Sequence, residues 1–344
     1  MLVYLALVAL VHELGHALLA RPAGFRLTSL GLGAGAPLLR IPLGQGRVFV
    51  LHRWFFLGGA CVAIPATLEG GRRAAWFHGG GVLAQLALAP VLRLLPAAWD
   101  LGDLEEINAL MLIGNLMPWR MGGQVSDGWR LFAALRPGGR GAGVLLDRRA
   151  ALQHLQRFEA ARGSPDGEAW ARLLLGWVGA QRGEKTVVEA ALTPPLREGA
   201  PVVLRALRLA LALDAARRGP EPEGAAPALW AEAEALQAEG VDPAARALVC
   251  GAAARLGIRV GDREGAARWI VAGGEGHDGG GLLRLAALER ALAEGAPTAA
   301  AAAACLDSLD GDPLDPAGAV AALTTAGQRG PGAEGWARRL RAAG

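Results

Sequence analysis

The chain has 344 residues, of which 52% are hydrophobic and only 19% are charged, and its mean hydropathy is +0.29. This composition is too apolar for an ordinary soluble protein, so we expect part of the chain to lie in a membrane. The net charge of +3 and the scattered arginines argue against nucleic-acid binding, and three distant cysteines without a CxxC pair argue against disulfides and thiolate metal sites.

The first apolar run covers residues 1–20 and is about as long as the roughly 20 residues that a helix needs to cross a bilayer. It lacks a basic amino-terminal region, and its polar residues lie in the middle of the run, where a signal peptide would be uninterrupted. A transmembrane helix is therefore expected in preference to a cleaved signal peptide. The 50 glycines and 20 prolines are as typical of a compositional bias as of structure. Glycine-rich patterns are therefore not interpreted as a motif such as a phosphate-binding loop.

Strands are expected between this run and the next one. Residues 25–64 are apolar but broken by Gly and Pro, and GRVFVLHRW alternates locally beside a GQG turn. This pattern predicts short strands and hairpins. Exposed strand edges are not tolerated in lipid, so a small sheet here should lie at the membrane interface or against the helices.

A second apolar run extends from Ala74 to about Trp99, and a third from Leu104 to Trp119. The turn between them, WDLGDLEE, is acidic, whereas arginines flank the other ends of the runs. Because positive residues favour the cytoplasmic side, three core transmembrane helices are predicted, with the amino terminus and the acidic turn outside. Everything after Arg136 is then expected to be cytoplasmic.

From about residue 140 the sequence is typical of amphipathic helices separated by Gly and Pro, as in APVVLRALRLALALDAARR and PALWAEAEALQAEG. Two stretches, starting at Ala169 and Ala245, are loosely alike and each predicts two helices across a Gly-containing turn. They resemble degenerate tetratricopeptide-type repeats, although a plain helical bundle fits equally well. The expected fold is mainly α, with a membrane domain over residues 1–136 and an all-α soluble domain over residues 137–344.

The motif HELGH lies inside the first apolar run. On a helix His12 and His16 share one face, so both imidazoles can reach one metal ion with Glu13 beside them. In zinc hydrolases two such histidines hold Zn²⁺ and the glutamate takes a proton from the water. The alternative is that the two histidines only hydrogen-bond to each other and bind no metal. However, burying an ionisable residue at membrane depth costs free energy, and such residues are usually functional.

A third ligand is expected from the stretch GNLMPWRMGGQVSDGWRL. Asn115 and Pro118 end the third apolar helix, Ser126 can cap another helix, and Asp127 at its start can direct a carboxylate to the metal. Asp-Gly is also a very common turn dipeptide, so a plain turn remains the alternative.

Together these motifs resemble the site-2 protease family of intramembrane zinc metalloproteases. HELGH matches the first family motif, and the second is matched by Asn115, Pro118, Asp127 and Gly128. The resemblance covers about residues 1–136. It implies that His12, His16 and Asp127 bind one zinc ion, that Glu13 is the general base, and that the strand-rich segment holds an extended substrate. It also implies that Asn115 lies near the substrate backbone.

The sequence departs from the family pattern in three ways. The spacing from Asn115 to Asp127 is longer than usual, and the family's G-P-x-x-N appears as GVLAQ, with Val82 and Gln85 in place of proline and asparagine. The Gln85 amide can still bond to substrate or to a loop. No PDZ-like insertion is present, so the helical region is expected to select the substrate.

The sequence therefore predicts an intramembrane zinc endopeptidase that cleaves a membrane-anchored protein in or near a transmembrane segment. Its expected partners are the membrane-protein substrate, lipid and a cytoplasmic protein bound by the helical domain, with no nucleic acid. One alternative is a proteolytically silent zinc-binding scaffold whose helical domain recruits that partner, but a scaffold needs no Glu13. A secreted HExxH peptidase is a second alternative. The second and third apolar runs disfavour it, because a soluble secreted enzyme would not need them.

Overall fold

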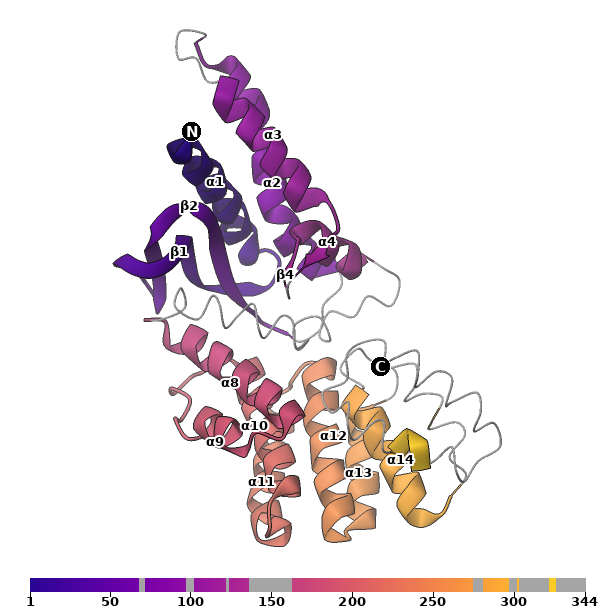
Figure 1. Ribbon diagram of the computed structural model, residues 1–344. Coiled ribbons are helices and arrows are strands. Elements are labelled where there is room, and N and C mark those ends of the chain that lie inside the picture. Colours follow the sequence, from indigo (N-terminus) through magenta and orange to yellow (C-terminus); the bar gives the residue numbers. More distant parts are fainter. Residues whose placement is uncertain are drawn as a thin grey trace. The chain divides into compact units, whose positions relative to one another are not determined.

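The computed structural model describes residues 1–67, 72–96, 102–121, 124–135, 163–274 and 281–296, with short pieces at 302 and 322–325. These residues form two compact units (Figure 1). Apart from Thr67, unit 1 contains the described residues up to Ala171 and unit 2 those from Arg172 onward. The division falls inside helix α8 (Pro165–Arg182). The expected mainly helical fold with a small sheet is confirmed.

Two helices of unit 1 are long and apolar enough to cross a membrane: α1 (Leu2–Ala20) and α2 (Arg72–Leu94). They coincide with the first and second predicted runs. Their backbones touch, because a Cβ atom on Gly15 would lie 2.3 Å from the carbonyl oxygen of Gly80. Real side chains do not approach so closely, so this crossing requires glycine on both helices.

The third predicted run forms α3 (Gly102–Leu116), which has 15 residues. The sequence predicted three membrane-spanning helices, but only two helices in the described part of the chain have the length and hydropathy for that role. The physical reason is local, since acidic residues occupy the first turn of α3 and Pro118 follows its end. Figure 1 shows α3 beside α1 and α2, and its Leu104 packs with Val8 and Leu92.

The predicted strands form one antiparallel pair, β1 (Phe25–Gly44) and β2 (Arg47–Pro65), joined by the expected GQG turn. They are much longer than predicted. Positive φ angles of 88° at Gly33 and 86° at Gly35 bend β1, which lets pairing continue past each bend. As a result residues 29–32 have partners on both sides, at residues 48–51 and 59–62.

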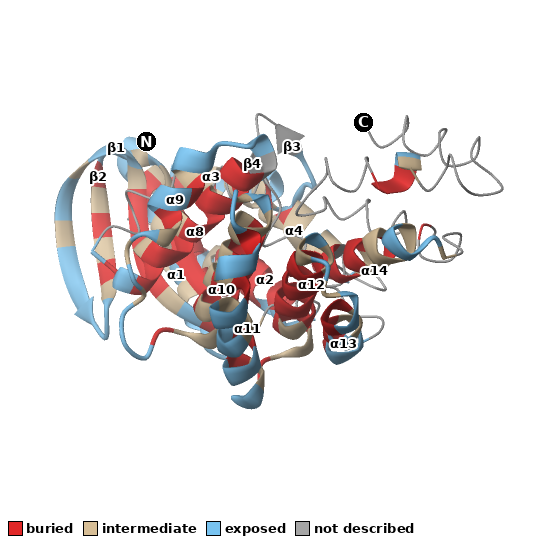
Figure 2. Cartoon of the chain, turned by 90° about the horizontal axis from the view of Figure 1, so that it is seen from below, coloured by how far each residue is buried: buried red, intermediate tan, exposed pale blue. Residues whose placement is uncertain are grey.

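One face of this sheet packs against the helices. Phe25, Leu30 and Cys61 are buried together with Ala74 and Phe77 of α2, and the rings of Phe25 and Phe77 stack with centroids 4.5 Å apart. Large apolar side chains on the rest of the hairpin are exposed, at Leu38, Leu39, Ile41, Leu43, Trp54 and Leu57 (Figure 2). The sheet therefore lies against the helices, as its apolar sequence required.

A short connection follows α3 in unit 1. Strands β3 (Arg120–Met121) and β4 (Gln124–Val125) form a two-residue ladder after α3, and α4 (Asp127–Leu135) begins directly after it. The expected helix start at Asp127 is confirmed. This connection returns the chain from the end of α3 to the side of α2, where α4 packs.

Unit 2 is helical, as expected. Its helices are α8 (Pro165–Arg182), which begins in unit 1, then α9 (Lys185–Leu192), α10 (Val202–Arg218), α11 (Pro222–Ala238), α12 (Pro243–Val260), α13 (Arg263–Gly273) and α14 (Gly281–Glu294). Helix α12 packs against α10, α11, α13 and α14 and is buried along most of its length (Figure 2). Asp242 caps its first turn, and Gly261 ends it in the left-handed conformation.

A buried charge network joins three helices of unit 2. The Arg255 guanidinium on α12, with a side chain only 1% exposed, donates two hydrogen bonds of 2.7 Å to the Glu289 carboxylate on α14. Asp214 on α10 lies 3.9 Å from the same guanidinium and is also paired with Arg217 and Arg218. Each buried charge therefore has an opposite charge beside it, as burial requires.

Candidate metal centre

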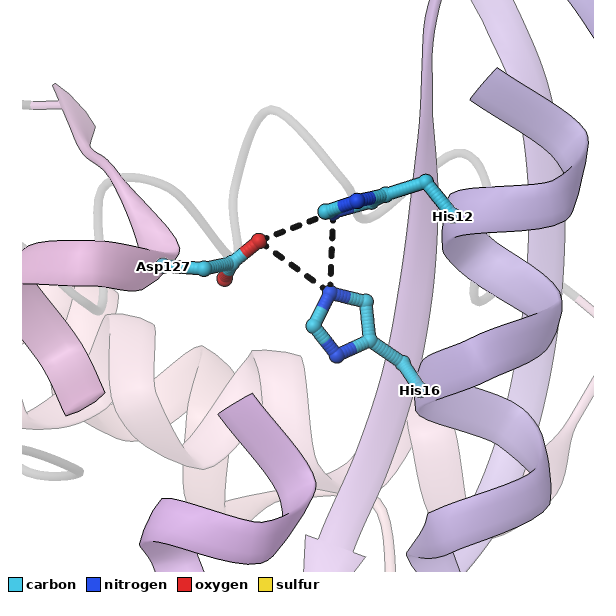
Figure 3. A group of neighbouring side chains, drawn as sticks. All are labelled: His12, His16 and Asp127. Atoms are coloured by element: carbon cyan, nitrogen blue, oxygen red, sulfur yellow. Dashed lines mark hydrogen bonds and ion pairs between the residues drawn. The ribbon is translucent and has the colours of Figure 1, made fainter. Parts of the chain in front are cut away.

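The site begins with two histidines on α1. His12 and His16 are one helical turn apart and only 6% and 5% exposed. Their Nε2 atoms lie 3.0 Å apart, and both rings project from the same face of the helix (Figure 3). This is the arrangement expected from an i, i+4 pair.

Asp127 faces this pair from the start of α4 (Figure 3). Its Oδ2 atom lies 2.9 Å from Nε2 of His12 and 3.1 Å from Nε2 of His16. The three ligand atoms lie within 4.8 Å of one another, in the one group of this kind found among the described residues. More than a hundred residues of sequence separate Asp127 from the histidines, so the fold brings them together.

The start of α4 is fixed by a cap and by a glycine. Ser126 accepts a hydrogen bond from the Trp129 amide at 3.1 Å and donates its hydroxyl to the Met117 carbonyl at 2.6 Å. A Cβ atom on Gly128 would lie 1.9 Å from the carbonyl oxygen of Leu116, so only glycine fits there. Gly128 is thus required by close packing on the end of α3, beyond what a plain turn would need.

Helix α2 orients both imidazoles. The carbonyl oxygen of Phe77 lies 2.7 Å from Nδ1 of His16, and Oε1 of Gln85 lies 2.9 Å from Nδ1 of His12. Both partners are acceptors, so each Nδ1 carries a proton, and Nε2 is the nitrogen of each ring that is left to bind a metal ion. Both Nε2 atoms lie on the side of Asp127, where a metal ion would need them.

The electrostatics of Asp127 favour a carboxylate. Burial by itself would raise the pKa of the Asp127 carboxyl, but the neighbouring imidazoles of His16 and His12 outweigh it and hold that pKa well below its usual range. Asp127 lies outside the two candidate membrane helices, and its side chain is 16% exposed. The group is therefore ionised, as a metal ligand must be.

Glu13 is buried on α1 beside the histidines and touches the sheet. A Cβ atom on Gly59 of β2 would lie 2.5 Å from Cγ of Glu13, so the β2 backbone lies directly against this side chain. The sheet and the glutamate are in contact only because residue 59 is glycine.

Asn115 and Gln85 lie at the same cluster. The Asn115 amide donates to Oε1 of Gln85 at 3.1 Å, and its Nδ2 is 3.2 Å from Nδ1 of His12. Gln85 is fully buried, and its backbone oxygen accepts a hydrogen bond of 3.0 Å from Asn108. All the residues singled out by their motifs are therefore brought to one region of unit 1.

The sequence pattern did not indicate that Phe77 and Gly81 of α2 contact the histidines, or that Gln85 bonds to His12. Phe77, Gly81 and Gln85 are spaced i, i+4, i+8, which is the spacing of one helix face and repeats the spacing of His12 and His16. The glycines here had been attributed to composition. His52 is not part of the cluster, because its Nδ1 donates to the Gly35 carbonyl at 2.8 Å within the sheet.

The donor set fits zinc. Two neutral imidazole nitrogens and one carboxylate oxygen are the usual protein ligands of a catalytic Zn²⁺, which keeps a fourth position for water. Here the three donors converge, both rings are held by their second nitrogen, and the surroundings are largely buried. Such oriented ligands are typical of metal sites.

A HExxH helix that is apolar enough to lie in a membrane, with an aspartate completing the ligand set, defines an intramembrane type of zinc metalloprotease. Residues 1–142 match the family model described as Peptidase family M50. This part of the chain belongs to that family, the site-2 protease family, whose members are membrane-embedded zinc metalloproteases. Comparisons with curated proteins and with solved structures found no match.

Proposed function

We propose that the protein hydrolyses a peptide bond in or near a transmembrane segment of a membrane-anchored protein. In this proposal His12, His16 and Asp127 hold one zinc ion and Glu13 is the general base. The observation that carries it is that the three ligand atoms, which come from α1 and α4, lie within 4.8 Å of one another. The match of this region to a protease family supports the reaction type.

The chain's own residues supply the proton transfers. A bound zinc ion would polarise the scissile carbonyl and make the attacking water more acidic. The Glu13 carboxylate takes the proton of that water and then gives it to the nitrogen of the leaving amine. The apolar helices around Glu13 exclude other water, which strengthens the electrostatic interactions at the site.

The substrate must be extended to be cleaved, since a helical peptide bond is shielded by its own hydrogen bonds. We infer that it pairs with an edge of the β1–β2 sheet, as extended peptides do when they add to a strand. The contact between Gly59 of β2 and Glu13 supports this, because it brings the sheet to the proposed base. In this proposal Asn115, which lies beside the ligands, bonds the substrate backbone, and a substrate contact of Gln85 stays a prediction.

The topology is part of the proposal. The membrane domain ends near residue 136, and the amino terminus is outside. Although α3 has only 15 residues, we infer that it is the third helix to cross the cell membrane, after α1 and α2. The helical domain, residues 137–344, is cytoplasmic and binds a protein partner. The successive helix pairs α8–α9, α10–α11 and α12–α13 support tetratricopeptide-like repeats in this domain.

Zinc content and proteolysis test this function together. We expect detergent-purified wild type to hold about one zinc ion, Asp127→Ala to lose most of it, and Glu13→Gln to keep it. Glu13→Gln should slow cleavage of a membrane-anchored reporter by about a hundredfold or more, because general base catalysis is lost. Glu106→Gln, an exposed carboxylate on α3, is the matched control and should behave as wild type.

Three results would contradict the proposal. Wild-type levels of zinc in Asp127→Ala would remove the aspartate from the ligand set. Cleavage that is unchanged by Glu13→Gln would remove the base, and zinc binding without any cleavage by the wild type would favour the silent scaffold.

A further inference from the structure

Helix α2 presents one continuous face to the two histidines. Along this face the Phe77 carbonyl accepts from His16, Gly81 lies against the ring of His12, and the Gln85 amide accepts from His12. A Cβ atom on Gly81 would be 2.4 Å from Cε1 of His12, so the ring is in direct contact with the helix backbone. The His12 ring is thus confined by Gly81 on one side and held at Nδ1 by Gln85.

We propose that Gln85 is a positioning residue for the metal centre, which fixes the tautomer and orientation of His12. The inference rests on the proposed zinc site. It differs from the substrate contact expected of Gln85 from the sequence, because the side chain is fully buried and its oxygen is already bonded to His12.

The hydrogen-bond pattern decides which end of the amide faces His12. Oε1 of Gln85 has two lone pairs, and two donors reach it: Nδ1–H of His12 at 2.9 Å and Nδ2–H of Asn115 at 3.1 Å. With the amide reversed, Nε2 of Gln85 would face the donor group of Asn115 and would require a lone pair on Nδ1 of His12. That would move the ring proton to Nε2, where it would block a metal ion.

The burial of Gln85 also supports a role of its amide oxygen toward His12. Its Nε2 is buried with no hydrogen-bond partner among the described residues, and a buried donor left unpaired is unfavourable. A residue chosen only for packing between apolar helices would not need an amide at this position. The retained amide is explained if its oxygen serves His12, since the partners of ligating histidines set metal affinity.

Zinc affinity measured by competition with a chelator, on the full-length chain in detergent, tests this role. Gln85→Met keeps the length and removes the acceptor, and we expect it to weaken zinc binding by about 10-fold to 100-fold. Gln85→Glu keeps an oxygen acceptor for Nδ1–H and should bind zinc within about threefold of wild type or more tightly. The Co²⁺ absorption spectrum, a direct report on ligand geometry, should change in the Met variant and stay wild-type in the Glu variant.

Asn108→Leu is the matched control, because Asn108 is equally buried and belongs to the same network but bonds only the backbone of Gln85. It should bind zinc as wild type does. Equal affinities for Gln85→Met and wild type would overturn the inference, as would equal losses in all three variants, which would indicate packing alone.

If Gln85→Met does not fold, the Gln85→Asn variant tests the positioning role instead. It keeps the amide but withdraws it by one methylene from His12, so we expect about tenfold weaker zinc binding, and wild-type affinity would overturn the role. A wild type that binds no zinc would refute the proposed function itself, which is a different outcome from an unchanged Gln85 variant.

Discussion

At the scale of single residues, the site depends on glycines at positions where no other side chain would fit. Gly15 and Gly80 allow α1 and α2 to touch, Gly81 makes room for His12, and Gly128 allows α4 to reach the end of α3. Each would place a Cβ atom closer than 3.0 Å to a neighbour. In a chain with 50 glycines these positions do not stand out by composition, and only their contacts identify them.

Gly81→Ala should displace the His12 ring and weaken zinc binding by about tenfold or more, as the loss of ligand orientation does. The reason is steric, because the new Cβ would lie 2.4 Å from the ring. Gly79→Ala is the control on the same helix, since its Cβ would meet only Leu131 Cδ1 at 3.8 Å. Both changes raise helix propensity equally, so chelator competition isolates the contact. Equal zinc affinities in the two variants would contradict this account.

Cys250 in unit 2 should be chemically inert. Burial raises the pKa of its thiol to about 12, although nearby Arg246 opposes the shift. Only the thiolate reacts, so iodoacetamide at pH 8 should leave Cys250 unlabelled in the folded protein and modify it after denaturation, as read by peptide mass spectrometry.

The same thiol makes stability depend on pH. Above pH 9 the unfolded chain releases the Cys250 proton while the folded chain keeps it, so the free energy of unfolding should fall as the pH rises. Rapid labelling of the folded chain would disprove the burial.

At the scale of elements, the sheet and α1 meet at the proposed base. The bends at the glycines of β1 and β2 fold two long strands over the helices, and Gly59 then lies on Glu13. The strand pattern in the sequence predicted the sheet and its turn. It underestimated the strand lengths, because a Gly bend looks like a strand end in the sequence although pairing continues beyond it.

Gly59→Ala should slow proteolysis by about tenfold or more and leave the zinc content unchanged, because it displaces Glu13 and touches no ligand. A double-mutant cycle with Glu13→Ala checks the contact. Removal of Cγ removes the clash, so Gly59→Ala should cost less stability in the Glu13→Ala background, by about 0.5–3 kcal/mol. Additive losses of stability would show that the alanine acts elsewhere, for example on the Gly31 carbonyl.

At the scale of the whole molecule, the chain has two compact units with separate cores. The proposed zinc ligands all belong to unit 1, whereas the buried ion network of Arg255 belongs to unit 2. Disruption of the second core should therefore leave the first one able to bind metal.

Arg255→Leu should destabilise unit 2 by about 3 kcal/mol, because Glu289 and Asp214 lose a buried partner. Zinc content should stay that of wild type. Arg290→Leu is the control, since its pair with Glu294 is partly exposed and worth about 0.5 kcal/mol. Thermal unfolding followed by circular dichroism measures the losses, and loss of zinc in Arg255→Leu would show that the units are not independent.

The sequence by itself determined what depends on neighbours along the chain. The i, i+4 histidines, the Ser126 cap before Asp127 and the GQG turn are local patterns, and the structure confirms all of them. Asp127 was also a candidate third ligand, as a carboxylate at the start of a helix, and the family resemblance favoured this ligand over a plain turn.

Only the tertiary structure decided how the site is held. That the Phe77 carbonyl and Gln85 orient the imidazoles, and that Gly59 meets Glu13, depends on how two helices and a sheet cross. Such contacts join residues 46 to 73 positions apart, where hydrophobic periodicity shows which face is buried but not which atoms meet across it. Close packing at glycines fixes that register, and this information exists only once the elements are in contact.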